Sequence, residues 1–101
     1  IETNDAERIW NAFRLANTAL DEGNAVEVFL LGDGVEAPDV ETETFNPHGV
    51  IRQFLQKDGE LFACGTCLDS RGLEADELRP RSTMGDLLGI VEHTDKVVTI
   101  G

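Results

Sequence analysis

Long hydrophobic runs, basic residues and cysteines are all scarce in this chain of 101 residues. No window approaches the roughly 18 continuous apolar residues of a membrane-spanning helix, so an integral membrane protein is not expected. Two cysteines three positions apart cannot staple a small secreted scaffold, and we therefore expect a reducing, cytoplasmic setting. With 41% hydrophobic residues, the chain is expected to form one globular domain over residues 1–101.

The shortage of basic residues leaves the chain strongly acidic. Eight Lys and Arg residues face twenty Asp and Glu residues, which gives a formal net charge of −12. Such a surface repels phosphate backbones, so direct binding to nucleic acid is not expected. The lysines are limited to Lys57 and Lys96. The composition fits an ordinary acidic cytosolic protein or a halophilic protein whose self-repulsion is screened by salt, and both interpretations stay open.

Helical and strand-like patterns alternate along the chain. Helical spacing is expected at residues 4–22, 46–57, 65–72 and 82–94, and short apolar runs typical of buried strands lie at 25–31, 60–64 and 96–100. This order predicts an open, mostly parallel α/β sheet with helices on both faces, a flavodoxin-like three-layer arrangement. The first helix has no strand before it. We therefore expect a hydrophobic first strand to precede Ile1, with Ile1 as its last residue.

The local patterns make three further predictions. Asn4 is expected to cap the first helix, with Glu7 three residues later as in a capping box. Residues 35–45 carry four acids and a proline without periodicity, which predicts a mobile surface loop. In the helix at 82–94, the side chains expected to point inward are Met84, Leu87, Leu88 and Val91.

In an open parallel sheet, ligands bind beyond the carboxyl ends of the strands. Three loops of this chain are expected at that edge, at residues 3–5, 32–35 and 64–67. The candidate substrate-binding residues in them are Asn4, Asp33, Gly34, Gly65 and Thr66. Asp33 can also be explained as a turn residue and Asn4 as a helix cap, and for Asn4 we favour the cap.

The pair Cys64 and Cys67 allows several interpretations. Structural zinc needs four ligands, and only His48 and His93 are left to complete a set, so no metal is expected. A thioredoxin-type couple also follows a strand, but that fold needs more strands after its motif than this chain has. The cysteines can also be packing residues at a strand end. The remaining option is one nucleophilic or sulfur-carrying thiol at Cys64.

The expected position of the thiols favours the reactive interpretation. A cysteine at a strand-to-helix junction faces unpaired backbone N–H groups, which lower the pKa of a thiol. Arg71 is expected one helical turn from Cys67 and two turns from Cys64, where its charge also favours a thiolate. Asp69 opposes this effect if its side chain points inward.

The segment ACGTCLDSRGL, residues 63–73, resembles the cysteine segment of the DsrE/DsrF-like sulfur-relay family. The resemblance is strongest to its YchN-like branch, in which a C-x-T-C-x-D-x-R-G-[IL] pattern follows a short strand. Residues 7–35 resemble the first helix and second strand of the family, and residues 93–101 resemble its closing strand.

The resemblance implies a sulfur carrier without a cofactor, and a homo-oligomer (trimer or hexamer) with cysteines near subunit boundaries. Cys64 matches the family cysteine that accepts a persulfide from a donor protein and passes it to an acceptor protein. Arg71 and the backbone N–H groups of residues 65–67 would stabilise the persulfide, and Cys67, shared with the YchN-like branch, would resolve it. Two rival functions remain, a non-catalytic assembly or ligand-binding subunit and a dithiol redox protein. The acidic residues 36–43 are either a docking patch for a basic partner or a solvated loop.

Overall fold

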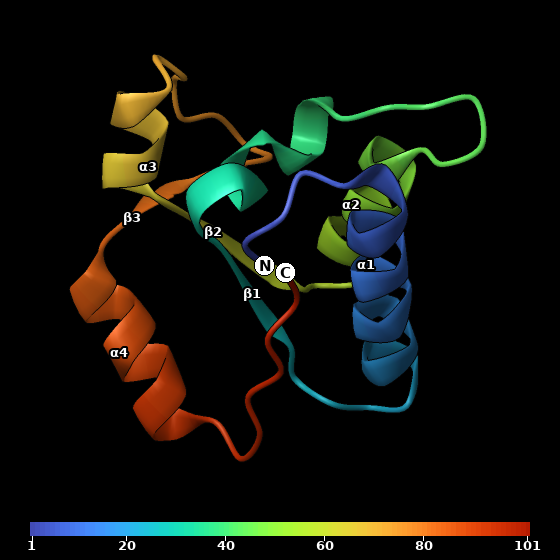
Figure 1. Cartoon of the computed structure of the whole chain (residues 1–101). Coiled ribbons are helices and arrows are strands. Elements are labelled where there is room, and N and C mark those ends of the chain that lie inside the picture. Colours follow the sequence, from blue (N-terminus) through green and yellow to red (C-terminus); the bar gives the residue numbers. More distant parts are fainter.

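The computed structural model describes residues 1–101 and has a parallel sheet between helices (Figure 1). Its elements are α1 (Ala6–Asp21), β1 (Glu27–Leu30), the 3-10 helix η1 (Gly32–Asp39), α2 (Pro47–Gln56), β2 (Glu60–Cys64), α3 (Gly65–Ser70), β3 (Arg81–Ser82) and α4 (Met84–His93). The three strands are parallel and lie in the order β1-β2-β3. Helices α1 and α2 cover one face and α4 lies on the other, which confirms the predicted open α/β fold. None of the helices is both long and apolar enough to cross a membrane.

The core forms where α1 and α2 pack against the sheet. Ile9, Phe13 and Ala16 recur at helical spacing on α1 and are buried, as the periodicity predicts. The ring of Phe13 meets that of Phe54 from α2 edge to face, with centroids 5.5 Å apart. Both rings are fully buried, and each such side chain stabilises the fold by about 1.5–3 kcal/mol through burial.

Helix α1 begins one residue later than predicted. Asp5, not Asn4, is its N-cap: the Asp5 Oδ2 atom accepts the backbone N–H of Arg8 at 3.0 Å. The Thr3 hydroxyl in turn accepts the backbone N–H of Asp5 at 3.0 Å, which fixes the turn before the helix. Since Asp and Asn cap equally well, sequence alone did not separate the two neighbours. The predicted cap of α2 is confirmed, because the Asn46 side chain accepts the Gly49 N–H and Pro47 is the first helical residue.

The loop predicted at residues 35–45 is wrong over its first half, because residues 32–39 form η1. Val35 and Ala37 are fully buried in the core. A 3-10 helix repeats every three residues, so a search for the α-helical period missed it. Arg79 holds this segment in place, since it pairs with Asp39 at 2.7 Å and donates to the Val35 carbonyl at 3.3 Å.

The inward face predicted for α4 is confirmed for Leu87 and wrong for Met84, Leu88 and Val91. Met84, Leu88 and Val91 are 58%, 59% and 45% exposed, whereas Leu87 and Ile90 pack against the core. Both groups are consistent with helical spacing, and only the docking of the helix decides which one faces the sheet. No residue of α4 is fully buried.

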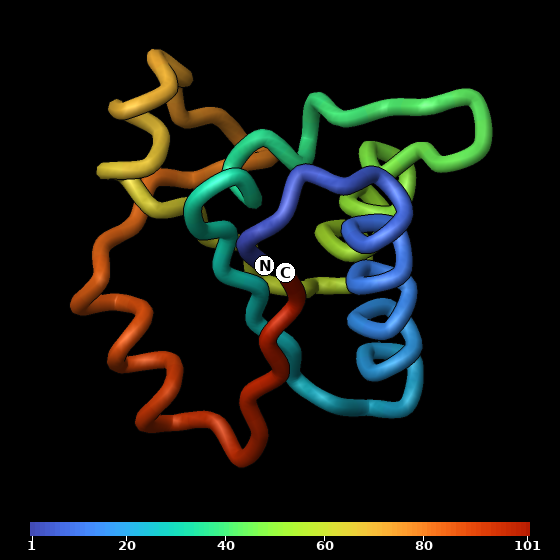
Figure 2. Tube along the Cα trace, in the orientation of Figure 1, coloured from blue at the N-terminus to red at the C-terminus, as the bar shows by residue number.

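The C-terminal residues 96–100 do not form the predicted strand. They run beside the N-terminal residues, and the tube in Figure 2 shows the two ends of the chain side by side. One backbone hydrogen bond joins them, from Glu2 N–H to the Ile100 carbonyl at 2.8 Å. Ile1 continues the sheet at the free edge of β1: its amino group donates to the Phe29 carbonyl, and its carbonyl accepts the Leu31 N–H. This alternation is that of a parallel ladder.

Replacement of Phe13 by Ala is predicted to destabilise the fold by about 3–5 kcal/mol, because a large buried ring is lost and a cavity is left. Leu15→Ala on the same helix is the matched control, since Leu15 is 55% exposed and should cost about 0.5 kcal/mol or less. Urea unfolding followed by circular dichroism measures both. Equal, small losses in the two variants would contradict the packing described here.

Candidate functional site

The two cysteines lie where β2 passes into α3. Cys64 is the last residue of β2 and the N-cap of α3, and its Sγ atom accepts the backbone N–H of Cys67 at 3.4 Å. Both thiols are free, and Cys64 is nearly buried, with 4% of its surface exposed. The strand-to-helix junction predicted for this pair is therefore present.

Cys67 connects the two neighbouring strand ends. Its Sγ atom accepts the backbone N–H of Gly32, at the start of η1, at 3.2 Å. Burial raises the pKa of the Cys67 thiol, and its contact with Cys64 raises the pKa further, whereas the Gly32 N–H and the charge of Arg71 lower it. The net direction is upward, opposite to the lowering expected from the junction alone. Because Cys67 is partly exposed, it remains the more accessible thiol of the two.

Arg71 fixes η1 against α3. Its NH2 atom pairs with Asp33 at 2.8 Å, its Nε atom with Glu36 at 3.4 Å, and its NH1 atom donates to the Cys67 carbonyl at 3.2 Å. The hydrogen bond with Asp33 is the main cause that raises the pKa of Arg71. Asp33 and Arg71, both predicted site residues, are thus brought together, on the side of Cys67.

A second arginine, Arg81, was missed by the sequence reasoning. It lies in β3 opposite Ala63, one position before the Ser82 that is opposite Cys64. Its guanidinium forms a two-point contact with Asp69, at 2.9 and 2.7 Å. A strand of two residues is too short to leave an apolar pattern, so the sequence does not predict β3.

The other predicted residues are not all part of the site. Gly65 is buried directly under Arg81, and Thr66 is exposed on the first turn of α3. Gly34 is buried against the backbone carbonyl of Ile1, where no side chain fits, so its role is packing. Asn4 is exposed, and no hydrogen bond joins its side chain to the cysteines.

No group of three or more His, Cys, Asp or Glu side chains is arranged to hold a metal ion. The two histidines lie on different helices, where each contacts its own helix. His48 accepts from Arg52 at 2.9 Å, and a ring nitrogen of His93 is 2.8 Å from the Gly89 carbonyl. Neither histidine therefore completes a ligand set with the cysteines.

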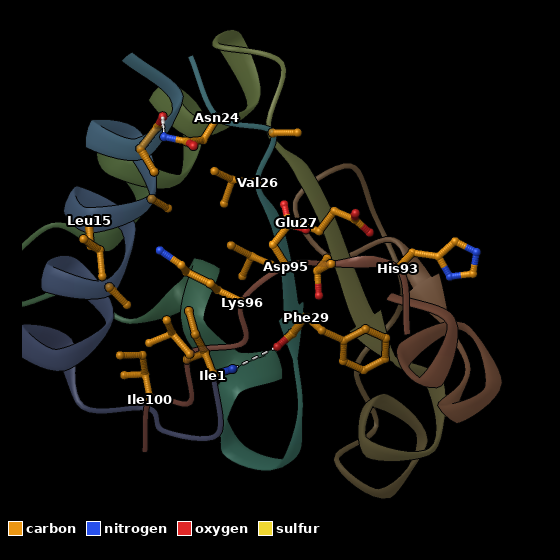
Figure 3. Close-up of a pocket in the computed structure, with 17 residues that line it drawn as sticks. Ile1, Leu15, Asn24, Val26, Glu27, Phe29, His93, Asp95, Lys96 and Ile100 are labelled. Carbon is orange, nitrogen blue, oxygen red and sulfur yellow. Dashed lines mark hydrogen bonds between the residues drawn. The ribbon is translucent and has the colours of Figure 1, made fainter. Parts of the chain in front are cut away.

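A cavity of about 620 Å³ lies between α1, β1 and the C-terminal residues 93–100 (Figure 3). Its lining is mainly apolar and includes Ile1, Leu15, Val26, Phe29 and Ile100. Neither cysteine lines it. The thiols therefore lie at a separate, open edge of the sheet rather than in a preformed chamber.

The acidic segment 36–43 divides into two parts. Glu36 and Asp39 are engaged with Arg71 and Arg79, within the fold. Glu41 and Glu43 are exposed. Two of the four acidic side chains are therefore paired with arginines of the chain, and neither the docking patch nor the solvated loop describes the whole segment.

Comparison with known proteins supports the resemblance of the cysteine segment. The model of the DsrE/DsrF-like family matches residues 2–100. An uncharacterized protein of Methanopyrus kandleri is 36% identical over 101 residues, covering 91% of this chain and 81% of its own length. An uncharacterized protein of Methanocaldococcus jannaschii is 35% identical over 99 residues, covering 92% and 87%. No solved structure matches significantly.

Replacement of Arg71 by Gln is predicted to slow alkylation of Cys67 in a Cys64→Ser background. The guanidinium favours the thiolate, so its removal raises the pKa of Cys67 and moves the alkylation profile to higher pH. Peptide mapping after iodoacetamide treatment at a series of pH values measures the shift. Arg52→Gln is the control, because Arg52 pairs with Glu77 on the exposed surface. An unchanged profile in Arg71→Gln would show that Arg71 only ties the loops together.

Proposed function

Because the chain belongs to the DsrE/DsrF-like family, we propose that it is a sulfur-relay protein in which Cys64 carries a persulfide sulfur. The observation that carries this proposal is the pair of free thiols, linked through backbone N–H groups, at the carboxyl ends of β1 and β2. Ligands of open parallel sheets bind at this edge. A sulfur donor protein and an acceptor protein are the partners that such a function requires.

The proposed transfer is a displacement at sulfur. The Cys64 thiolate attacks the outer sulfur of a donor persulfide, the S–S bond of the donor breaks, and the donor leaves as a thiolate. Cys64 then carries the outer sulfur as Cys64–S–SH. An acceptor thiolate attacks the same outer sulfur and leaves Cys64 as a thiolate again. No net oxidation occurs, because one S–S bond forms for each one that breaks.

The backbone at this edge suits an anionic sulfur. The N–H of Cys67 points at the Sγ atom of Cys64, and the N–H of Gly32 points at the Sγ atom of Cys67. Hydrogen bonds from fixed N–H groups stabilise charge without reorganisation during the reaction. Such donors favour the thiolate that leaves after the acceptor attacks.

Cys67 is proposed to limit the lifetime of the persulfide. Its thiolate would attack the inner sulfur, Sγ of Cys64, and release hydrosulfide as a Cys64–Cys67 disulfide forms. Thiol–disulfide exchange with an external dithiol then returns both cysteines to the reduced form. The raised pKa of Cys67 keeps this thiol mostly protonated near neutral pH, so the resolving step is slow unless a partner changes its surroundings.

A second candidate, a non-catalytic subunit of a homo-oligomer, is favoured by one feature of α4. Met84, Leu88 and Val91 are each at least 45% exposed, and they are spaced so that they share one face of the helix. Large apolar side chains gathered on a surface are typical of an interface. In this account the nearly buried Cys64 is a packing residue.

The proposed carrier is tested by intact-mass spectrometry after polysulfide treatment of the wild type, Cys64→Ser and Cys67→Ser. An added mass of about 32 Da, one sulfur atom, is expected on the wild type and on Cys67→Ser but not on Cys64→Ser. The adduct should last longer in Cys67→Ser, because the resolving thiol is gone.

Two other outcomes would reject the carrier. A Cys64–Cys67 disulfide that forms without any persulfide, and exchanges with a dithiol, would identify a redox protein. No adduct on any variant, with both thiols slow to alkylate, would favour the oligomer subunit. Sedimentation of the wild type beside Met84→Ser and Leu88→Ser measures the oligomeric state independently of the thiols.

A further inference from the structure

We propose that Arg81 is the anion-binding residue for Cys64 and that Asp69 is the residue that positions it. This inference rests on the proposed sulfur-relay function and adds to it a residue that lies outside the cysteine segment. The geometry of β3, Gly65 and Asp69 carries it.

The sheet and a glycine place Arg81 over the residue that follows Cys64. In the parallel pairing of β2 with β3, Arg81 is opposite Ala63 and Ser82 is opposite Cys64. The Arg81 guanidinium covers Gly65, the residue after Cys64: a Cβ atom built on Gly65 would lie 2.9 Å from both Cζ and Nε of Arg81. The absence of a side chain at position 65 therefore makes room for the guanidinium against the backbone that follows Cys64.

Asp69 holds the guanidinium in this place. It lies one helical turn after Gly65 on α3, on the same face, and its two oxygens accept from NH1 and NH2 of Arg81. A two-point contact of this kind sets the orientation of the guanidinium plane as well as its distance. The pKa of Arg81 is raised chiefly by Asp69, and the negative charge of a Cys64 thiolate raises it further.

Arg81 has more free donors than Arg71. All three nitrogens of Arg71 are engaged, with Asp33, Glu36 and the Cys67 carbonyl. A guanidinium has five N–H groups. Arg81 uses two of them on Asp69, so its Nε–H and one N–H on each terminal nitrogen have no partner within the chain. Its side chain is 54% exposed, so these donors are open to an incoming anion.

The charges around the thiols show why an anion would depend on Arg81. The charged and titratable groups in the contacts around the two cysteines are Asp33 and Glu36 from η1, Cys67 and Asp69 from α3, Arg71 at the end of α3, and Arg81 from β3. Three carboxylates thus stand against two guanidiniums, in a chain whose net charge is −12. An anionic donor sulfur would meet a repulsive field here if Arg81 were absent.

The test compares a neutral and an anionic alkylating reagent on Cys64, in a Cys67→Ser background that leaves one thiol. The ratio of the iodoacetate rate to the iodoacetamide rate reports attraction of the anion, and it does not depend on how reactive the thiol is. Arg81→Gln is expected to lower this ratio about threefold, the effect of one partly exposed charge. Arg81→Lys keeps the positive charge and should therefore retain most of the wild-type ratio.

Two variants control for unrelated effects. Arg52→Gln removes one positive charge from the exposed surface of α2 and should leave the ratio unchanged. Gly65→Ala keeps Arg81 but pushes its guanidinium aside, so it should lower the ratio as Arg81→Gln does. Thermal unfolding of each variant shows that it is folded. If Arg81→Gln does not fold, the ratio in Gly65→Ala decides.

A ratio that is the same in Arg81→Gln, Gly65→Ala and Arg52→Gln would overturn the assignment of Arg81. The sulfur-relay proposal fails on a different measurement, the absence of a persulfide on Cys64. A lowered ratio without any persulfide would therefore keep Arg81 as an anion-binding residue and reject the relay. A persulfide on Cys64 with an unchanged ratio would support the relay and reject Arg81 as the anion-binding residue.

Discussion

The parallel pairing of β1 with β2 is the constraint on which the cysteine site depends. Because both strands run in the same direction and end at the same edge, the start of η1 and the start of α3 meet there. The N–H of Gly32 then reaches the sulfur of Cys67, although the two residues are 35 positions apart. The same edge receives Arg81 from β3, so three consecutive strands of the sheet each supply part of the site.

Ion pairs then divide the site between its two thiols. Arg71, engaged by Asp33 and Glu36, lies on the side of Cys67, while Arg81, engaged by Asp69, covers Gly65, the residue after Cys64. Each guanidinium is oriented by a carboxylate. The carboxylate fixes the position of the guanidinium but also neutralises part of its positive charge. The strongly acidic composition therefore has a local role here, because acidic residues place the few arginines that the site has.

The errors of the sequence predictions have different physical origins. The pattern of α4 identifies a helix correctly, but two sets of apolar residues satisfy its period, and only docking selects Leu87 and Ile90. Residues 96–100 have strand-like composition, but the one backbone hydrogen bond from Glu2 to Ile100 does not make a strand ladder, and Val97 and Val98 stay exposed. Buried Val35 escaped notice because the 3-10 period differs from the one that was sought.

The amino-acid sequence by itself determined the α/β class, the bounds of β2 and α2, the strand-to-helix junction at Cys64 and the family resemblance. These features depend on residues that are close along the chain, where periodicity, caps and spacing act. Only the tertiary structure decided that Gly32 donates to Cys67, that Arg71 is occupied by Asp33 and Glu36, and that Arg81 covers Gly65. Those contacts join distant segments, and their partners are chosen by strand order and helix docking, which no local pattern encodes.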